Sequence, residues 1–395
     1  MKMVFLAPFG IRPKGTVLAR MIPLAAQLQH LGHEVVVIAP PYTNPEDSGK
    51  KETVRGVTLQ NVELGPRHKV LAAPILAWRM FRAALSEKPD LVHLFKPKGY
   101  GGLAAMLHIV LQRVGVRLPP LFLDTDDWEG AGGMNELHDY SGVEKRFYHF
   151  QEQWLTRQAV GVSVASRALE VLVGRMDVPP SRLLYLPNCV SSVPGGDGAK
   201  ARAALGIPPE APVVLLYTRF FEFSQEKLHQ LFEKIHRQVP QARFLVVGKG
   251  RAGEEDLLLA AARERGFLSA LVVAGWVEPA QLPDYLAAGD VAIYPFADNL
   301  INRTKCPAKL TELLLAERAV VADRVGQLAE YVVNGRSGVL CDPQRWDEMV
   351  EQVVTLLRDP VRRAELGTNG RALLLERFNW AGAAGELAAF YNRLV

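Results

Sequence analysis

The sequence has little of what marks disulfide-rich, membrane-spanning or nucleic-acid-binding proteins. Its three cysteines, Cys189, Cys306 and Cys341, lie far apart and form no CxxC pair, which argues against a disulfide framework and a structural zinc site. No run of about 18 uncharged apolar residues occurs, so no segment is expected to span a membrane. The net charge of +4 comes without a basic stripe interleaved with aromatics, so we exclude nucleic acid as a partner. These absences favour a reducing, cytoplasmic location.

A secretory signal is also missing from the first residues. The stretch MKMVFLAPFG is apolar only as far as Pro8 and has no small-residue cleavage site, so we interpret it as a first β-strand. The chain of 395 residues, 49% of them hydrophobic, is long enough for two domains with separate cores. Its mild positive charge favours phosphates, acidic sugars or an anionic membrane surface as partners.

Short β-branched runs alternate with helical patterns along the whole chain. Strands are predicted in the first half at KMVFLAP, HEVVVIAP, DLVHLF, PLFLDT and AVGVSVAS, and in the second half at PVVLLYT, RFLVVG, LVVAG, VAIYPF, AVVAD and GVLCD. Nearly continuous apolar strands separated by helices predict parallel sheets covered on both faces. NCVSSVPGGDGAK, residues 188–200, breaks this pattern and predicts a linker. The fold class is therefore α/β, with doubly wound domains over residues 1–187 and 188–379 and one more amphipathic helix over 380–395.

Carboxylates follow one strand of the first domain. LFLDTDDWEG places Asp124, Asp126 and Asp127 at a strand's carboxyl end, which is the edge where open parallel sheets bind ligands. Contact with a polar substrate is the favoured interpretation because of this location. A helix-capping cluster and a site for Mg²⁺ or Mn²⁺ stay open as alternatives.

The second domain carries a formal GxGxxG at Gly248, Gly250 and Gly253. A dinucleotide site also needs an acidic residue after the next strand, and SALVVAGW has none. We therefore favour a tight turn beside a ligand over a nicotinamide or flavin site. Earlier in this domain, Arg219 follows a strand and Lys227 opens the next helix, where two cations would clamp an anion, although a lone lysine is often only a solvated helix residue.

CPAKLTELLLAERAVVADRVG combines a helix start with a buried strand. Pro307 suits the first helical position, and the amides of Ala308 and Lys309 then form an anion site at the positive end of the helix. Glu312 projects from the first turns and can accept hydrogen bonds from two hydroxyls. A surface glutamate is equally compatible with the spacing.

Taken in order, these segments resemble the retaining glycosyltransferases of family 4, which have the GT-B fold. CPAKLTELLLAERAVVADRVGQLAEYVVNGRSGVLCDP is similar to their donor-binding segment, PKGTVLARMIPLAAQLQHLGHEVVVIAP to their opening, and LPDYLAAGDVAIYPF and ERFNWAGAAGELAAFY match as well. The resemblance covers nearly the whole chain. It implies two Rossmann-like domains facing across a cleft, with the acceptor in the first domain, a nucleotide sugar in the second, and the helix over 380–395 packed back on the first.

Site residues follow from the resemblance position by position. It implies that Glu312 binds the nucleotide ribose, that Arg219 and Lys227 neutralise the diphosphate, and that Lys309 faces the phosphates. The remaining donor contacts it implies are Gly15, in a glycine loop near the phosphates, and Gly250, Gly275 and Trp276, against the base.

Three positions depart from the family pattern. Thr304 stands where many members have a second glutamate, Gly15 is followed by Thr16 rather than by a second glycine, and DTDDW replaces a His-Asp pair. Asp126 or Asp127 would then contact the transferred sugar or position the acceptor.

The implied activity is transfer of a hexose from a nucleotide-diphosphate sugar to a hydroxyl of a saccharide, glycolipid or cell-envelope polysaccharide precursor. Retention of the anomeric configuration is expected, with no metal and no cofactor. A catalytically weak nucleotide-sugar-binding relative is the alternative. Residues 67–88 form a basic amphipathic helix, which either covers a sheet or lies on anionic lipid at the inner face of the membrane.

Overall fold

The structure is a computed structural model that describes residues 1–12, 15–66, 68–191 and 195–395. It divides the chain into two compact units. Unit 1 consists of Met1–Cys189, Thr304–Cys306 and Phe378–Val395, and unit 2 of Val190–Arg303 and Pro307–Arg377. The division after Cys189 lies inside the segment predicted as a linker.

Unit 1 is built on an eight-stranded sheet in the order β3-β4-β2-β1-β5-β6-β7-β8. Its strands are β1 Lys2–Leu6, β2 Glu34–Ala39, β3 Lys51–Val54, β4 Val57–Asn61, β5 Leu91–Phe95, β6 Leu121–Thr125, β7 Gly161–Val164 and β8 Leu183–Tyr185. All neighbours pair in parallel, as predicted, except β3 and β4, which form an antiparallel hairpin at the edge that was not predicted. Arg55 and Gly56 both have positive φ, 51° and 82°, as a two-residue hairpin turn requires.

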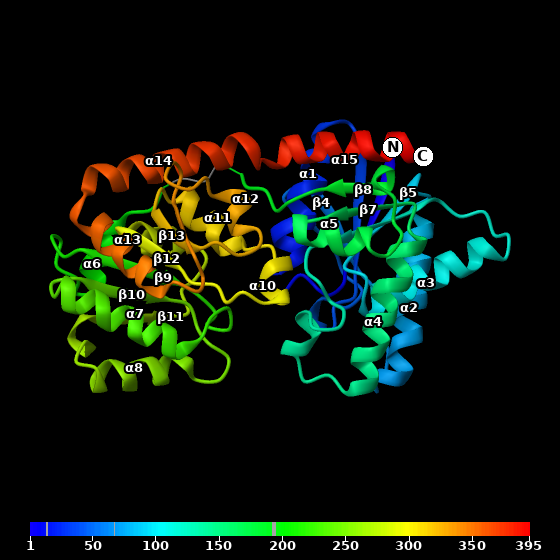
Figure 1. The fold of residues 1–395 in the computed structure, drawn as a ribbon. Helices are drawn as coiled ribbons and strands as arrows, with labels where there is room; N and C mark the ends of the chain where they lie inside the picture. The colour runs from blue at the N-terminus through cyan, green and yellow to red at the C-terminus, as the bar shows by residue number, and fades with distance from the viewer. Residues whose placement is uncertain (13–14, 67, 192–194) are drawn as a thin grey trace. The chain divides into compact units, whose positions relative to one another are not determined.

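The helices of unit 1 pack on this sheet as its apolar pattern requires. They are α1 Ile22–His30, preceded by a π-helical turn η1 Val17–Met21, then α2 Lys69–Ser86, α3 Gly99–Arg113, α4 Gly142–Gln158, α5 Arg167–Gly174 and α15 Trp380–Leu394. The carboxy-terminal α15, red in Figure 1, lies beside α1 and buries Trp380, Leu387 and Tyr391. Within the described residues, no helix has the combination of length and apolar character needed to cross a bilayer.

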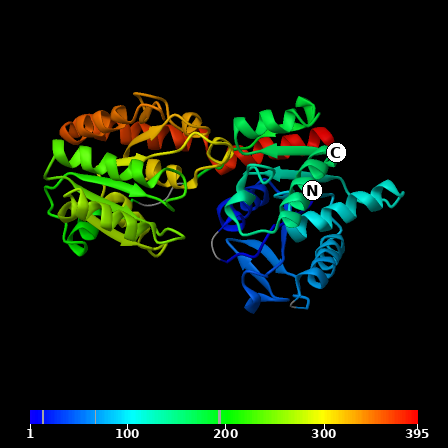
Figure 2. The same ribbon diagram turned by 60° about the horizontal axis from the view of Figure 1, so that its bottom comes forward.

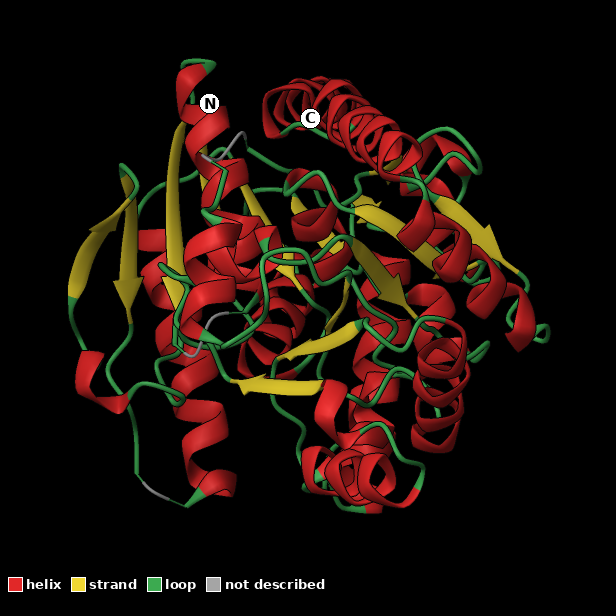
Figure 3. Ribbon diagram, turned by 90° about the vertical axis from the view of Figure 1, so that its left-hand side faces the viewer, coloured by secondary structure: helices red, strands yellow, loops and turns green. Residues whose placement is uncertain are grey.

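Unit 2 contains a six-stranded, wholly parallel sheet in the order β11-β10-β9-β12-β13-β14. The six strands predicted from the sequence are all present, as β9 Val213–Tyr217, β10 Arg243–Val247, β11 Leu271–Gly275, β12 Val291–Tyr294, β13 Ala319–Asp323 and β14 Val339–Cys341. Figure 2 and Figure 3 show the alternation of strands and helices, which Figure 3 draws with strands in yellow and helices in red.

The helices of unit 2 include α6 Gly198–Ala204, α7 Gln225–Gln238, α8 Glu254–Glu264, α9 Leu282–Ala287, α11 Ala308–Leu315, α12 Leu328–Tyr331, α13 Trp346–Arg358 and α14 Pro360–Arg377. Helix α10, Leu300–Thr304, lies mostly in unit 2, but its last residue, Thr304, belongs to unit 1. Helix α6 begins inside the predicted linker, because Asp197 caps it by accepting a hydrogen bond from the Lys200 amide at 3.0 Å. The core contains residues of β9, β10, β12 and β13 together with α7, α8 and α13, with Phe232 stacked on Phe244 at 4.4 Å.

Each sheet has one point where the strand order reverses. In unit 1 the reversal falls between β1 and β5, and in unit 2 between β9 and β12. Open α/β sheets bind ligands just beyond the carboxyl ends of the strands at such a point. The topology therefore predicts a ligand-binding edge in each unit, beyond β1 and β5 in unit 1 and beyond β9 and β12 in unit 2.

Candidate functional sites

In unit 2, a narrow cavity lies at the reversal point. It is lined by the ends of β9 and β12 and the residues that follow them: Leu216, Tyr217, Thr218, Glu222, Phe223, Tyr294, Pro295 and Phe296. The glycine at the end of the neighbouring strand β10 is required by close packing. Gly248 has φ of +119°, and a Cβ there would lie 2.0 Å from the Thr218 carbonyl oxygen.

Tyr217, the last residue of β9, contacts two predicted site residues on α11. Burial of its phenol, followed by the charge of Glu312 and a hydrogen bond to that carboxylate, raises the pKa of Tyr217. The Nζ of Lys309 lies 4.7 Å from the centre of the tyrosine ring, in a cation–π contact. The Tyr217 hydroxyl thus bonds the Glu312 carboxylate, while the face of its ring contacts the Lys309 ammonium. Sequence reasoning passed over Tyr217, whose only signal was a hydroxyl at the end of an otherwise apolar strand.

The charge of Arg219 acts on Tyr217, whereas the Lys227 ammonium has partners on another loop. The charge of Arg219 opposes the rise in the Tyr217 pKa, and Arg219 itself is exposed to solvent. Lys227 donates from Nζ to the Pro343 carbonyl oxygen at 2.8 Å and lies 3.8 Å from the centre of the Trp346 ring. Burial lowers the pKa of Lys227, with Asp323 and Asp342 as the nearest opposing charges. The structure therefore groups Arg219, Lys309 and Glu312, and directs the Lys227 ammonium to the loop between β14 and α13.

The start of α11 differs from the prediction by one residue. Pro307 is the N-cap, with φ of −85° and ψ of 78°, and the helix begins at Ala308. Pro307 therefore contributes a carbonyl oxygen, which accepts from the Leu310 amide at 3.0 Å, instead of occupying the first helical position. Thr304, where many family members have a glutamate, is buried, and its carbonyl oxygen accepts from Ser166 Oγ at 3.0 Å within unit 1.

Two other predicted donor contacts lie on loops after β10 and β11. The Gly250 amide donates to Glu255 Oε1 at 2.8 Å, which folds the turn over the start of α8. Trp276 directly follows β11 and is 68% exposed. An indole left this open is available to stack on a planar ligand.

In unit 1, the predicted aspartates surround a lysine that sequence reasoning missed. The Lys96 ammonium lies 2.8 Å from Asp126 Oδ1, 2.7 Å from Asp127 Oδ2 and 3.3 Å from Glu129 Oε1, with Lys96 only 5% exposed. Burial opposes the ionisation of Lys96. The three carboxylates outweigh this effect and raise the pKa of Lys96 well above its usual value. Its position directly after β5, in KPKGY, was the signal available.

The carboxylate group extends to Lys98, Glu152 and Thr16. Lys98 Nζ donates to Glu129 Oε2 at 2.7 Å and to Asn135 Oδ1 at 2.9 Å. Burial and the neighbouring Glu129 raise the pKa of Glu152 well above its usual value. Thr16 Oγ1 donates to Asp126 Oδ2 at 3.1 Å.

Gly15 was predicted to lie in a glycine loop near the donor phosphates. Its carbonyl oxygen accepts a hydrogen bond from the Ala19 amide at 3.0 Å. It therefore begins the helical turn that leads into η1. Thr16, and not Gly15, contributes the side chain that reaches the carboxylates.

Asp124 has a different role from Asp126 and Asp127. It forms a bidentate pair with Arg20, at 2.8 Å and 2.6 Å, and both side chains are almost wholly buried. Burial opposes the charge of Arg20, but Asp124 raises its pKa. Arg20 also donates to the Leu186 carbonyl oxygen at 2.7 Å and to Asn188 Oδ1 at 3.1 Å, so the pair ties β6 to the segment that follows β8.

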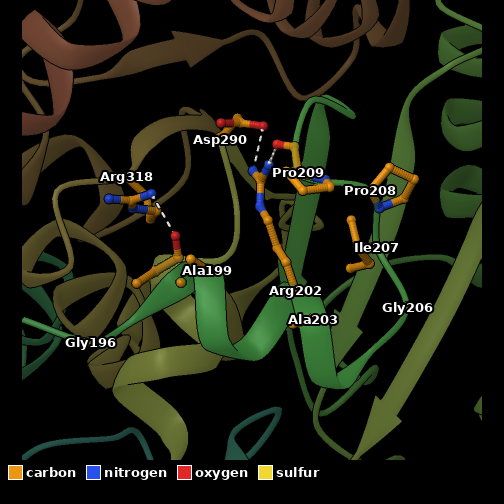
Figure 4. Close-up of a pocket in the computed structure, with 12 residues that line it drawn as sticks. Gly196, Ala199, Arg202, Ala203, Gly206, Ile207, Pro208, Pro209, Asp290 and Arg318 are labelled. Atoms are coloured by element: carbon orange, nitrogen blue, oxygen red, sulfur yellow. Dashed lines mark hydrogen bonds and ion pairs between the residues drawn. The ribbon is translucent and has the colours of Figure 1, made fainter.

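A larger cavity, of about 720 Å³, lies at the opposite end of the unit 2 sheet (Figure 4). Arg202 donates there to the carbonyl oxygens of Ala288 and Pro209 and to Asp290, and Arg318 donates to the carbonyl oxygen of Ala287. These guanidinium groups join the loops that precede β9, β12 and β13. Because the cavity faces the amino ends of the strands, we assign it a structural role.

Two protein families match this chain. The family described as Glycosyl transferase 4-like domain matches residues 15–189, and the family described as Glycosyl transferases group 1 matches residues 211–359. The glycogen synthase of Mycobacterium tuberculosis is 24% identical over 391 residues, which cover 93% of this chain and 88% of that protein.

Solved structures show the same architecture. The sucrose-phosphate synthase of Thermosynechococcus elongatus has a TM-score of 0.75 at 20% identity, covering 100% of this chain and 99% of that chain. HepE of Anabaena, in complex with UDP-glucose, has a TM-score of 0.72 at 19% identity, covering 99% of each chain. At these identities the likeness establishes the fold.

Proposed function

Because the chain belongs to the GT-B glycosyltransferases with a 4-like domain and a group 1 domain, we propose that it transfers a hexose from a nucleotide-diphosphate sugar. The proposed acceptor is a hydroxyl of a saccharide, glycolipid or cell-envelope polysaccharide precursor, and the anomeric configuration is retained. UDP-glucose, the ligand of HepE, is one donor of the proposed class. The proposed compartment is the cytoplasm, where the three cysteines would stay reduced.

The observation that carries this proposal is the group around Tyr217 in unit 2. Glu312 would accept hydrogen bonds from the nucleotide ribose, while Lys309 and Arg219 would face the diphosphate. Tyr217 restrains Glu312 and Lys309 before any ligand arrives, which lowers the ordering cost of binding. The amides at the start of α11 would add the positive end of a helix dipole.

The chemistry follows from where charge develops. As the bond from the anomeric carbon to the phosphate oxygen breaks, its electron pair passes to the diphosphate, and fixed cations stabilise this transition state more than the ground state. The acceptor oxygen forms the new bond from the same face, and its proton passes to the departing phosphate oxygen. In unit 1, Asp126 or Asp127 would orient the acceptor or the transferred sugar.

Donor binding can be tested by thermal shift with UDP, GDP and ADP. A ligand that binds only the folded chain raises the melting temperature, so one nucleotide should stabilise the protein and thereby name the base. In Glu312→Ala this stabilisation should be lost, because two charge-assisted hydrogen bonds of about 1.5–3 kcal/mol each disappear. The matched control is Glu351→Ala, on the exposed face of α13. Full stabilisation of Glu312→Ala would contradict the assignment of this residue to the ribose.

Metal removal provides a second test. Asp126, Asp127 and Glu129 direct their oxygens at the Lys96 ammonium, which occupies the position a shared cation would need. We therefore expect the rate of nucleoside diphosphate release to be unchanged by EDTA. A loss of activity that Mg²⁺ or Mn²⁺ restores would favour the metal interpretation of these carboxylates.

The proposal includes a peripheral membrane contact through α2. Helix α2 buries Leu76, Met80 and Ala84 against unit 1, while Leu71, Ile75 and Trp78 are 59%, 37% and 48% exposed on its outer face. Residue 67, the first basic residue of the predicted segment, lies outside the described residues.

Liposome sedimentation measures this contact. Arg79 donates to the carbonyl oxygens of Glu63 and Leu64 at 2.8 Å and 2.7 Å, so Arg82 is the better residue for charge reversal. Binding to vesicles that contain anionic lipid should fall in Arg82→Glu and in Trp78→Ser. Equal sedimentation of both variants and the wild type would exclude the contact through α2.

A weak nucleotide-sugar-binding relative is the alternative function, favoured only by Thr304 in place of a glutamate. Such a protein would show nucleotide stabilisation without transfer. Release of nucleoside diphosphate that a saccharide acceptor accelerates would exclude it.

A further inference from the structure

Four tyrosines that lie far apart in the sequence meet at the carboxyl edge of the unit 1 sheet. Tyr42 follows β2, Tyr100 lies in the first turn of α3 after β5, and Tyr140 and Tyr148 come before and within α4. The rings of Tyr42 and Tyr100 are 5.3 Å apart in an edge-to-face arrangement, and those of Tyr140 and Tyr148 are 5.0 Å apart. We call this group the tyrosine cluster.

The two pairs form one group next to the buried carboxylates. Tyr100, whose ring pairs with that of Tyr42, lies two residues after Lys98, and burial followed by the charges of Tyr140, Tyr100, Tyr148 and Glu129 raises the pKa of Tyr42. Lys98 Nζ lies 5.8 Å from the centre of the Tyr140 ring and 6.0 Å from that of Tyr148. Since Lys98 also binds Glu129, the cluster adjoins the group of Lys96, Asp126 and Asp127.

The cluster keeps its aromatic surface accessible. Tyr42 is 44% exposed and the other three rings are partly exposed. Each phenol has a raised pKa from burial, so at neutral pH it keeps its proton and can both donate and accept a hydrogen bond. A tyrosine offers an apolar face and a polar tip, which matches a sugar ring with its C–H face and its hydroxyl rim.

The charges beside the cluster disfavour an anionic ligand. Lys96 has three carboxylate partners, Lys98 has Glu129 and Asn135, and Arg20 has Asp124. The four carboxylates in these pairs, Asp124, Asp126, Asp127 and Glu129, outnumber the three cations, and Glu152 adds a fifth carboxyl group beside Glu129. A phosphate or carboxylate brought here would find these cations already paired and would lie close to their carboxylate partners.

The geometry points to the tyrosine cluster as the acceptor subsite, and to an uncharged saccharide as the acceptor class. This inference rests on the proposed function, which requires an acceptor in unit 1, and it narrows that acceptor to a neutral sugar ring lying on Tyr42 and Tyr100 with its reacting hydroxyl toward Asp126 and Asp127. Phosphorylated sugars and sugar acids are excluded as preferred acceptors by the same charges.

Saturation-transfer NMR tests the inference without knowledge of the donor. The probes are maltose and sucrose as neutral saccharides, and glucose 6-phosphate and glucuronic acid as anionic ones. The wild type should bind a neutral probe more tightly than either anionic probe. Tyr42→Leu and Tyr148→Leu should each weaken that binding about tenfold, the equivalent of one aromatic contact. Tyr42→Phe should keep most of it, and Tyr285→Leu, on α9 of unit 2, is the matched control.

Thermal stabilisation by nucleoside diphosphates, measured on the same variants, separates the two proposals. The tyrosine variants should be stabilised as the wild type is, which also shows that they are folded. Preference for an anionic probe, unchanged binding in both leucine variants, or failure of both neutral probes to bind overturns the acceptor inference even if nucleotide binding is intact. Failure of every nucleotide to stabilise the wild type overturns the proposed function instead.

Discussion

Replacing Arg219 by alanine should lower kcat by about 10²–10³-fold while leaving the melting temperature nearly unchanged. Arg219 is exposed, so its removal leaves no buried charge behind, yet its guanidinium is placed beside Tyr217 where it would meet the departing diphosphate. A preorganised donor aimed at developing charge acts mainly on the transition state, so the donor KM should change less than kcat. Initial rates of nucleoside diphosphate release at varied donor concentration measure both constants.

Two further variants make the Arg219 result specific. Arg263→Ala removes an exposed arginine of α8 and should leave kcat at the wild-type value. Lys227→Ala should have a smaller effect than Arg219→Ala, because the Lys227 ammonium is held by the Pro343 carbonyl oxygen and Trp346. A larger loss in Lys227→Ala would mean that this lysine leaves its contacts to bind the diphosphate, as the family resemblance implies, and that Arg219 is secondary.

Replacing Arg20 by methionine should destabilise the protein by about 3–5 kcal/mol, since it leaves the Asp124 carboxylate buried without its partner. Arg20 also binds Leu186 and Asn188, so the variant loses the contacts that fix the segment after β8. Thermal unfolding followed by circular dichroism should show the first transition lowered by roughly 10 °C, by the scaling for a domain of this size.

The double variant Arg20→Met/Asp124→Leu distinguishes pairing from packing. Replacing both members of a buried ion pair by apolar residues is often neutral, so the double variant should melt at a higher temperature than Arg20→Met alone. If the double variant were as unstable as the sum of the single variants, the hydrogen bonds of Arg20 to Leu186 and Asn188 would be the larger contribution.

The sequence predicted the central strands better than the edges. The inner strands of both sheets are apolar on both faces, which makes them recognisable as buried parallel strands without any knowledge of their neighbours. The hairpin of β3 and β4 was missed because its strands are short and partly exposed, and Arg55 with Gly56 is an inconspicuous turn signal. The start of α11 was misplaced by one residue because Pro307 fits both the N-cap and the first helical position.

Site residues were predicted where a motif or a strand end marked them, and missed where only a partner defines them. Glu312, Lys309 and Arg219 could be named from the chain, but nothing in their spacing indicates that Tyr217 contacts Glu312 and Lys309. In the sequence, Lys96 is indistinguishable from an ordinary loop lysine. In the structure, three carboxylates surround its ammonium group. Hydrogen bonds and ion pairs between residues far apart in the chain depend on which strands are neighbours. The hydrophobic periodicity of a segment predicts a strand but does not predict the order of strands in the sheet.

The amino-acid sequence by itself determined that this protein has two α/β units with parallel strands, because alternation of apolar runs and amphipathic helices is a local property of the chain. It also determined the membership in the glycosyltransferases, since the motifs that carry the family likeness are continuous segments. Only the tertiary structure decided that Lys227 is engaged away from Arg219, that Arg20 and Asp124 form a buried pair, and that four scattered tyrosines share one surface. Those facts depend on through-space distances, which the folding of the sheets sets and the order of residues does not.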